Sequence, residues 1–324
     1  MRNRFIIDVR SPGEYAYSHI PQALSFPVLN DQEYEEVGTL YRANTFEAKR
    51  VGSMYICQNI AKHLKNEEIF HPRNKLILYC ARGGQRSKSF WSILSSIGFD
   101  CERIEGGYKS YRNEVLNYFS TPPTQSFITL YGMTGCGKSE LIEHCSSWSI
   151  DIEGLSKHYG SSFGDEANSF EGQPTNSMFE NQLYEELMSK QGGVLLVEGE
   201  SKKLGKIIIP TPFFESYHNG VSVQVSSSLQ NRIKRIVTMY SSIKEEDFLS
   251  SLNKIKPYIK KEYFEEILTE WKKRDCEKIA EILLEKYYDR VYRQKQCQYE
   301  INSDNLLEAV EKIEGIRSEI LRQI

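Results

Sequence analysis

Short runs of consecutive apolar residues, each bounded by turn residues, alternate with helically spaced segments along the first part of the chain. Residues 5–9 and 75–80 have the pattern of buried strands, and 87–97 has apolar residues at the spacing of a helix. A further strand, 127–131, precedes a glycine-rich turn and a helix that begins near Lys138. The repeated order of strand, loop and helix predicts an α/β fold.

The pattern changes at two points, and these predict the domain organisation. Residues 120–125 read STPPTQ, and paired prolines with small polar residues are typical of a linker. After a buried strand at 193–197, the pattern becomes long, charged and helical from about residue 229. The 324 residues suffice for two domains. We expect an α/β domain over 1–120 and a second over 126–324 with a helical C-terminal extension.

The composition limits the class of protein. Hydrophobic residues make up 40% of the chain and charged residues 26%, which allows packed cores and is too balanced for a disordered tail. The net charge of −3 argues against a broadly basic DNA-coating protein, although it leaves room for a local nucleic-acid site. The N-terminus lacks a signal-peptide pattern, and no stretch approaches the ~20 apolar residues of a membrane span. We expect a cytoplasmic protein with no membrane partner.

The seven cysteines form no Cys-x-x-Cys pair, and their odd number excludes a disulfide framework that uses every thiol. The histidines do not cluster with them at zinc spacing, so no metal site is predicted. Both observations fit a reducing compartment.

The clearest candidate for covalent chemistry is the loop after the strand at 75–80. It reads Cys80-Ala-Arg-Gly-Gly-Gln-Arg-Ser87, so a cysteine at a strand end precedes an arginine at a helix N-terminus. Backbone N–H groups and glycines at such a junction favour a bound anion, and Arg82 and Arg86 add charge and forked donors. A thiolate in this cradle can attack phosphorus, or can attack sulfur or selenium. The plainer alternative is a buried cysteine in a surface turn.

The surrounding segments bear on this choice of chemistry. Asp8-Val-Arg-Ser-Pro-Gly-Glu-Tyr15 with His19-Ile-Pro-Gln-Ala23 resembles the entry signature of rhodanese-like sulfurtransferase domains. Glu105-Gly-Gly-Tyr108 resembles the turn after their active-site helix. The resemblance implies that Asp8, Arg10 and Glu14 fix structure. The Cys-x5-Arg spacing also resembles phosphatases of the same fold, but no local carboxylate is identified to protonate a leaving group.

The second candidate site is a phosphate-binding loop. Gly132-Met-Thr-Gly-Cys-Gly-Lys-Ser139 matches G-x4-G-K-[ST] between a strand and a helix, the context that this motif requires. Its amides would surround a diphosphate, Lys138 would neutralise it, and Ser139 could ligate Mg²⁺. Cys136 reads as a small filler rather than a second nucleophile. The residues expected to bind the diphosphate are Gly132, Thr134, Gly135, Gly137, Lys138 and Ser139.

Acidic residues near other strand ends could serve this loop. Glu198 follows the strand at 193–197, where a Walker-B-like acid would sit, but the sequence Glu-Gly-Glu does not predict strong nucleotide hydrolysis. Asp151 and Glu153 could form a base or metal pair at an acceptor site. The alternative for both is helix capping and solvation.

One chain that joins the cysteine loop to the phosphate loop resembles the tRNA 2-selenouridine synthases. The resemblance covers nearly the whole chain and includes both loops, with Asp151-Ile-Glu-Gly-Leu155, Gly160-Ser-Ser-Phe-Gly164 and Val197-Glu-Gly-Glu-Ser201. The chain departs from the family pattern at Leu40, Tyr159, Asn176, Ser177 and Gly199.

The family resemblance implies that selenium replaces sulfur at C2 of the wobble 2-thiouridine of tRNA in two steps. Geranyl diphosphate first alkylates the sulfur at the phosphate loop, where Lys138 stabilises the departing pyrophosphate. Selenium from selenophosphate then displaces the S-geranyl group, with Cys80 receiving selenophosphate or carrying selenium and with Arg82 and Arg86 on its oxyanions. The implied co-substrates are selenophosphate and geranyl diphosphate, with Mg²⁺ as a further ligand. The implied partner is the anticodon region of tRNA.

Basic clusters in the helical part could contact tRNA. Arg232, Lys234 and Arg235 form the cluster least diluted by acids; the alternative for any cluster is the solvated face of an amphipathic helix. Two other functions stay open. One is a Cys-x5-Arg phosphatase fused to a phosphate-loop kinase, and the other is a nucleotide-gated rhodanese that relays sulfur. Copurified tRNA would favour the synthase, since neither rival requires it.

Overall fold

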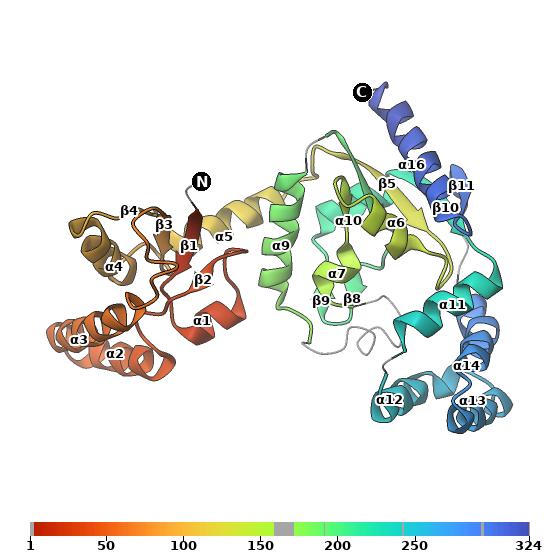
Figure 1. The fold of residues 1–324 in the computed structure, drawn as a ribbon, viewed down its shortest axis with the longest axis horizontal. Helices are drawn as coiled ribbons and strands as arrows, with labels where there is room; N and C mark the ends of the chain where they lie inside the picture. Colours follow the sequence, from red (N-terminus) through yellow and green to blue (C-terminus); the bar gives the residue numbers. More distant parts are fainter. Residues whose placement is uncertain (1–2, 159–171, 191, 242, 293–294, 324) are drawn as a thin grey trace. The chain divides into compact units, whose positions relative to one another are not determined.

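The computed structural model describes residues 3–158, 172–190, 192–241, 243–292 and 295–323. The chain divides into two compact units, Met1–Tyr118 and Phe119–Ile324, which we call the N-terminal unit and the C-terminal unit. Figure 1 shows the elements of each. In both units parallel strands alternate with helices, so the predicted α/β class is confirmed.

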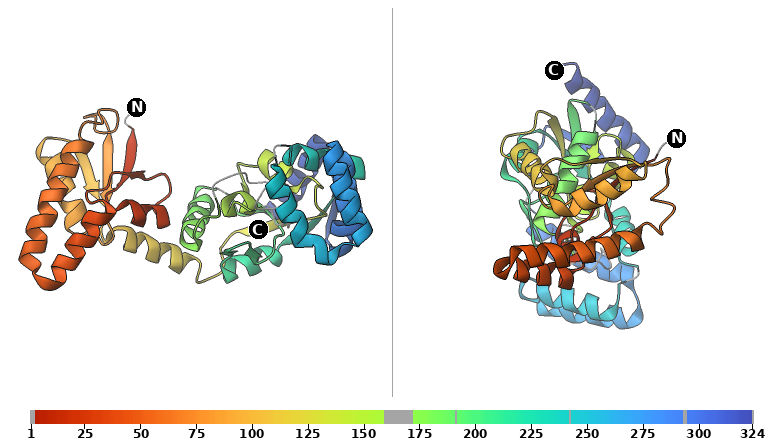
Figure 2. Two further views of the ribbon diagram at one scale, coloured as in Figure 1. Left: turned by 90° about the horizontal axis from the view of Figure 1, so that it is seen from below. Right: turned by 90° about the vertical axis from the view of Figure 1, so that its left-hand side faces the viewer.

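The N-terminal unit contains a parallel sheet of four strands in the order β2-β1-β3-β4. Its main core lies on one face of the sheet, where Ile7 and Leu78 pack with Phe90 and Leu94. The helices α2 and α3 pack on each other as a pair (Figure 2). The elements are β1 (Arg4–Asp8), α1 (Pro12–Tyr17), β2 (Leu24–Ser25), α2 (Asp31–Ala43), α3 (Thr45–His63), β3 (Lys75–Tyr79), α4 (Gln85–Ser96), β4 (Asp100–Arg103) and α5 (Gly107–Tyr118).

The C-terminal unit contains a parallel sheet of five strands in the order β11-β10-β5-β7-β6. The chain runs from the central strand β5 to β6 and β7 on one side and then crosses to β10 on the other. Ligands of open α/β sheets bind outside the carboxyl ends of the strands at such a switch point, here the loop after β5. The elements up to this crossing are β5 (Ser126–Tyr131), α6 (Lys138–His144), β6 (Ser149–Ile150), α7 (Ile152–Ser156), α9 (Asn176–Ser189), β7 (Val194–Glu198), β8 (Lys203–Leu204), β9 (Ile207–Ile208), α10 (Thr211–His218) and β10 (Val221–Ser226).

Helices cover both faces of this sheet, and the side chains of β5 alternate between them. Ile128 lies in the core formed with Leu141 of α6 and Ile313 of α16 (Leu306–Leu321). On the opposite face, Phe127 packs edge-to-face on Phe213 of α10, with ring centres 5.6 Å apart. Burial on both sides explains why the strand reads as a continuous apolar run. The packing holds β5 in place, and with it the start of the loop that follows.

The region from residue 229 is mainly helical, as predicted. Phe248 and Trp271, whose rings stack at 3.9 Å, lie in a separate apolar core of this region. One strand, β11 (Tyr299–Asn302), was not predicted; only Ile301 of its four residues is buried, so it has no apolar run. The helices are α11 (Leu229–Met239), α12 (Glu245–Ile255), the short η1 (Lys256–Tyr258), α13 (Lys261–Lys273), α14 (Cys276–Leu283), the π-helix η2 (Leu284–Tyr288), α15 (Asp289–Val291) and α16.

Two further findings concern membranes and thiols. Among the described residues, no helix is both long and apolar enough to cross a bilayer. All seven cysteines are free thiols, and Cys80, Cys136 and Cys145 are the buried ones.

Candidate functional site

Cys80 lies between the end of β3 and the start of α4, and its side chain is buried. Sγ accepts a hydrogen bond from the backbone N–H of Gly84 at 3.2 Å and lies 3.2 Å from Oγ of Ser87. The Ser87 hydroxyl also donates to the carbonyl oxygen of Gly84 at 3.3 Å, so the backbone N–H is the group that stabilises negative charge on the sulfur. The loop therefore holds this thiol in surroundings that suit a nucleophile.

The start of α5 holds the cysteine loop in shape. The backbone N–H of Tyr108 donates to the carbonyl oxygen of Cys80 at 2.9 Å. Gly107 permits this approach, because its φ is 61° and a Cβ there would lie 2.1 Å from that oxygen and 2.5 Å from N of Gly83. The glycine turn at 105–108 therefore supports the loop directly.

Arg86, in the first turn of α4, is bound by Glu14 of α1. Its Nη1 and Nη2 donate to the two carboxylate oxygens at 2.5 and 3.1 Å, and its guanidinium lies 4.9 Å from the ring centre of Tyr34. Burial alone would raise the pKa of Glu14, but the hydrogen bonds and charge of Arg86 lower it. Arg82 is exposed. Of the two arginines expected to hold an oxyanion, one thus has a carboxylate partner within the unit and the other faces solvent.

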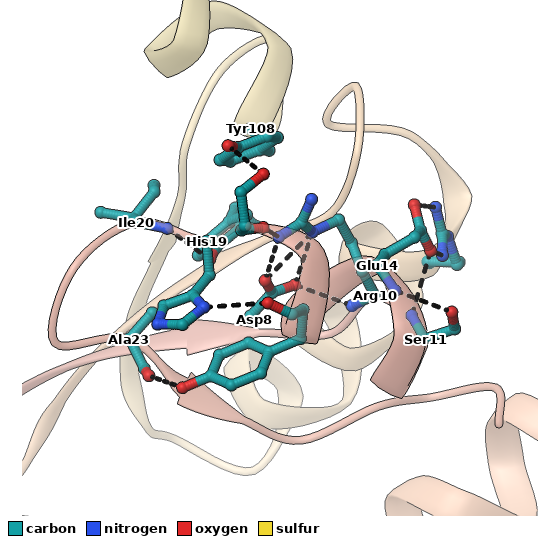
Figure 3. Close-up of polar contacts among 12 residues, drawn as sticks. Asp8, Arg10, Ser11, Glu14, His19, Ile20, Ala23 and Tyr108 are labelled. Carbon is teal, nitrogen blue, oxygen red and sulfur yellow. Dashed lines mark hydrogen bonds and ion pairs between the residues drawn. The ribbon is translucent and has the colours of Figure 1, made fainter. Parts of the chain in front are cut away.

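A buried ion pair fixes the chain before α1 (Figure 3). Nη2 of Arg10 donates to Oδ2 of Asp8 at 2.6 Å and to the carbonyl oxygen of Ser18 at 2.7 Å. A buried charge pair is tolerated when its remaining hydrogen bonds are also satisfied, as they are here. Glu14 continues this network, since it closes the capping box of α1 and binds Arg86.

The phosphate loop joins β5 to α6, which begins at Lys138. Nζ of Lys138 donates across the loop to the carbonyl oxygen of Gly132 at 2.9 Å. Burial lowers the pKa of Lys138, but Cys136, Glu200 and Glu153 nearby outweigh this effect and raise it. Lys138 therefore carries a positive charge at the loop, as binding of a diphosphate requires.

Acidic side chains from α7 and the end of β7 lie beside the loop. Oε2 of Glu153 accepts a hydrogen bond from Oγ of Ser139 at 3.2 Å, and Oε2 of Glu198 accepts one from the backbone N–H of Ile152 at 3.3 Å. Burial and the neighbouring Glu200 raise the pKa of Glu153 to about 8. Burial, with Glu153 nearby, raises the pKa of Glu198 well above its ordinary value. Oε1 of Glu198 is buried without a hydrogen-bond partner among the described residues.

A cavity of about 660 Å³, lined by both charged and apolar groups, includes the phosphate loop in its wall. Glu153 and Glu200 also line it, as do Lys234 and Arg235 of α11. Such a volume lies in the range of small-molecule sites. The cavity brings the predicted phosphate loop next to the predicted basic cluster. Gly135 of the loop and Arg235 of the cluster lie 100 positions apart in the chain. The predicted diphosphate-binding residues in its wall are Gly132, Thr134, Gly135, Gly137, Lys138 and Ser139.

Arg232 of α11 is committed to the phosphate loop. Its side chain is buried; Nη1 and Nη2 bind the carboxylate of Asp289 at 2.9 and 2.5 Å, and Nε donates to the carbonyl oxygen of Thr134 at 2.9 Å. These bonds connect the loop through α11 to α15. Arg232 was expected to contact tRNA, and the structure gives its guanidinium partners within the chain.

Arg235, like Arg232, binds groups within the chain, whereas Lys234 is exposed. Arg235 donates to Oε2 of Glu140 at 2.8 Å and to the carbonyl oxygen of Ser303 at 2.9 Å. Lys234 is exposed in the cavity wall and makes no ion pair with the residues that the structure describes. Of the predicted tRNA cluster, Lys234 is the residue whose charge is open to an outside partner.

Two other residues singled out in the sequence have local structural roles, and one segment lies outside the described residues. Asp151 is the N-cap of α7, with Oδ1 accepting a hydrogen bond from N of Gly154 at 2.7 Å. Gly199, where the chain departs from the family pattern, lies against Tyr131; a Cβ there would come within 2.3 Å of its ring. The segment 159–164, which contains Tyr159 and the Gly-Ser-Ser-Phe-Gly motif, lies outside the described residues.

Some site residues were not anticipated from the sequence. Oγ of Ser303 donates to the carbonyl oxygen of Cys136 at 2.6 Å, and Asp289 holds Arg232. A serine after an unrecognised strand carries no local signal. Glu200 was visible, since it stands two positions after Glu198 in Glu-Gly-Glu.

Both units match known families. Residues 125–274 match the tRNA 2-selenouridine synthase AAA domain, and residues 1–114 match the rhodanese-like domain, which confirms the fold predicted for the N-terminal unit. A tRNA 2-selenouridine synthase of Psychromonas ingrahamii is 32% identical over 75% of this chain and 67% of its own length. One of Shewanella frigidimarina is 33% identical over 78% and 70%, and one of Hydrogenovibrio crunogenus is 29% identical over 94% and 93%.

Proposed function

Because the chain belongs to the tRNA 2-selenouridine synthase family and is therefore a tRNA-modifying enzyme, we propose that it replaces sulfur by selenium through an S-geranylated intermediate. The substrate is the wobble 2-thiouridine of tRNA, and the co-substrates are geranyl diphosphate and selenophosphate. The observation that carries the proposal is that one chain holds a cysteine whose sulfur accepts a backbone N–H bond and a phosphate loop in the wall of a large cavity. Each loop suits one step.

The phosphate loop suits the first step. The sulfur at C2 of the base attacks C1 of the geranyl chain, the carbon–oxygen bond breaks, and pyrophosphate leaves with the bonding electrons. The N3 proton of the base passes to solvent. Lys138 and the loop amides stabilise the negative charge that develops on the leaving group. Lys138 would exchange its bond to the carbonyl oxygen of Gly132 for the diphosphate.

The cysteine loop suits the second step. Selenium of selenophosphate bonds to C2, geranylthiol leaves, and water takes the phosphoryl group. Cys80 receives selenophosphate, since its sulfur accepts a backbone N–H and is placed to bear negative charge. Arg82, which is exposed, and Arg86, which is held by Glu14, supply positive charge for the phosphate oxygens.

Mg²⁺ would be held jointly by the protein and the diphosphate. Among the described residues, no group of three or more His, Cys, Asp or Glu side chains could hold a metal alone. Mg²⁺ at phosphate sites commonly has only one or two protein ligands, with substrate oxygens and water for the rest. Ser139 and Glu153, which lie 3.2 Å apart, and the unpartnered oxygen of Glu198 fit that role.

The tRNA would reach both loops through its anticodon region, where the wobble base lies, in the cytoplasm. Lys234, exposed beside the phosphate loop, is the cation we assign to a phosphate of this tRNA.

The experiment that tests the function is reconstitution. The protein is incubated with 2-thiouridine tRNA, geranyl diphosphate and selenophosphate, and the nucleosides are analysed by mass spectrometry. We expect 2-selenouridine with both co-substrates and S-geranyl-2-thiouridine when selenophosphate is left out. tRNA without the 2-thio group is the matched control and should stay unchanged. If neither product forms from the thiolated tRNA, the proposed function is wrong.

A further inference from the structure

A second cavity in the C-terminal unit is lined almost entirely by apolar groups. It holds about 70 Å³ and lies among α11, α12, α13 and α14. Its wall includes the stacked rings of Phe248 and Trp271 and the side chains of Ala280 and Leu283. Protein interiors are normally packed close to crystal density, so a space of this size among apolar side chains is available to an apolar ligand.

The apolar cavity adjoins the larger cavity at the phosphate loop. Thr134, Ile236 and Tyr240 line both. Thr134 belongs to the phosphate loop itself. Ile236 lies in the last turn of α11, and Tyr240 is the C-cap residue four positions later. A molecule with an anionic head and a hydrocarbon tail would therefore find the phosphate loop and an apolar cavity next to each other.

An ion pair and a hydrogen bond connect the wall of the apolar cavity to the phosphate loop. Tyr288, the last residue of the π-helix η2, lines the apolar cavity. The next residue, Asp289, binds Arg232, and Arg232 donates to the carbonyl oxygen of Thr134. Single π-helical turns occur frequently at functional sites. The same segment thus forms one wall of the apolar cavity and anchors the phosphate loop.

We propose that the apolar cavity binds the tail of a prenyl diphosphate whose diphosphate group lies on the phosphate loop. This inference rests on the proposed function for its diphosphate group and adds the site that selects the tail. A nucleoside phosphate, the other common ligand of such loops, would bring polar groups that have no partners among these apolar side chains.

The size of the cavity sets how much of the tail it takes. About 15 Å³ of such volume is needed for one water-sized group. The 70 Å³ exceeds what one such group needs, and we assign it to a single isoprene unit of the tail. The unit next to the diphosphate would lie beside Thr134 and Ile236, and the second unit would fill the apolar cavity. Burial of five carbon atoms should tighten binding at least about 100-fold.

A series of ligands tests this assignment on the full chain. Isothermal titration calorimetry compares inorganic pyrophosphate, dimethylallyl diphosphate and geranyl diphosphate. We expect the first two to differ little and the third to bind at least about 100-fold more tightly. If all three bind with equal affinity, the tail site is wrong and the phosphate loop keeps its role. If none binds, the diphosphate step of the proposed function fails as well.

Two variants locate the tail. Ala280→Leu fills the cavity from α14, and Cys276→Phe blocks its exposed rim, with Glu277→Phe on the neighbouring exposed position as the matched control. In both cavity variants geranyl diphosphate should bind no more tightly than dimethylallyl diphosphate, while unchanged pyrophosphate binding shows that the unit is folded. The control should keep the full difference. A full chain-length difference in the cavity variants would place the tail elsewhere.

Trp271 provides a readout that does not depend on catalysis. The chain has three tryptophans, so Trp91→Phe with Trp148→Phe leaves the one in the cavity wall. Geranyl diphosphate should change its fluorescence emission, and pyrophosphate should not. The same emission with both ligands would contradict a tail beside Trp271.

Discussion

The cysteine loop and the phosphate loop both connect a buried parallel strand to the first turn of a helix, and both depend on glycines. They differ in what surrounds them. Around the cysteine loop, the start of α5 holds the carbonyl oxygen of Cys80, and Glu14 holds Arg86, so the loop is fixed by short contacts. The phosphate loop instead borders a cavity of about 660 Å³, in which Nζ of Lys138 donates to the carbonyl oxygen of Gly132 at 2.9 Å and lies 4.0 Å from Sγ of Cys136.

This difference shows how one local plan serves two kinds of chemistry. A nucleophile must be held at one point, and the backbone N–H of Gly84 and the hydroxyl of Ser87 do so for Cys80. A site for a departing diphosphate needs space and a cationic side chain that can turn toward the ligand. The cavity and Lys138 supply these. The following predictions test whether the two loops divide the reaction in this way.

The largest effect is expected for Cys80→Ser. The variant should lose selenation entirely while geranylation proceeds, because a serine hydroxyl stays protonated and cannot replace the thiolate. Nucleoside mass spectrometry of tRNA incubated with each co-substrate in turn measures the two steps. Cys57→Ser, at an exposed position of α3, should behave like the wild type. Equal loss of both steps in Cys80→Ser would refute the division between the loops.

Lys138→Ala should reverse the pattern. Loss of the charge that stabilises pyrophosphate should slow geranylation on the order of 100- to 1,000-fold. Selenation of tRNA that is already S-geranylated should continue at the wild-type rate, which single-turnover assays can measure. Lys312→Ala, at an exposed position of α16, is the matched control. Slow selenation of the geranylated tRNA would mean that the phosphate loop also serves the second step.

Gly107→Ala should damage the cysteine loop alone. The added Cβ would meet the carbonyl oxygen of Cys80 at 2.1 Å, so we expect the N-terminal unit to lose about 3 kcal/mol of unfolding free energy. Gly98→Ala has the same kind of left-handed φ, 94°, but no atom within 4 Å, and should cost only about 1 kcal/mol. Urea unfolding with both variants measures the difference. Equal losses would show that strain, and not the close approach, makes glycine necessary.

The smallest effect concerns the acids beside the phosphate loop. Burial and Glu200 raise the pKa of Glu153 to about 8, from an ordinary value near 4.5. Between these values the folded protein holds a proton that the unfolded chain has lost, so this group makes stability fall as pH rises. Glu153→Gln removes the effect and should be the more stable protein at pH 9, with no gain at pH 4. Thermal melts across this range measure it; a difference that does not vary with pH would contradict the raised pKa.

Much of the fold followed from local patterns, but several strands were not predicted. The strands β1, β3, β5 and β7 are buried on both faces and read as apolar runs, so each was predicted. β11 has one buried residue and was not predicted, although it places Ser303 under the carbonyl oxygen of Cys136. Most of the strands that were not predicted lie at sheet edges, where fewer apolar residues are needed and the pattern is weak. The inner strand β10, in which apolar and polar residues alternate, was not predicted either.

The candidate site shows the same limit. Cys80 and Lys138 were identified by motif, because each motif encodes a strand, a loop and a helix start within eight or so residues. Arg232 and Arg235 were taken for a surface cluster, because the sequence does not show that Asp289, Glu140 and Ser303 bind them.

The sequence by itself determined the two loops and the family to which they point, since backbone turns and helix starts depend on neighbouring residues. Only the tertiary structure decided what each loop faces. Arg86 meets Glu14 across 72 positions, and Arg232 meets Asp289 across 57. The raised pKa of Glu153 and the apolar cavity beside Thr134 also arise from segments brought together by packing. Burial and charge proximity depend on distance in space, and periodicity along the chain does not encode that distance.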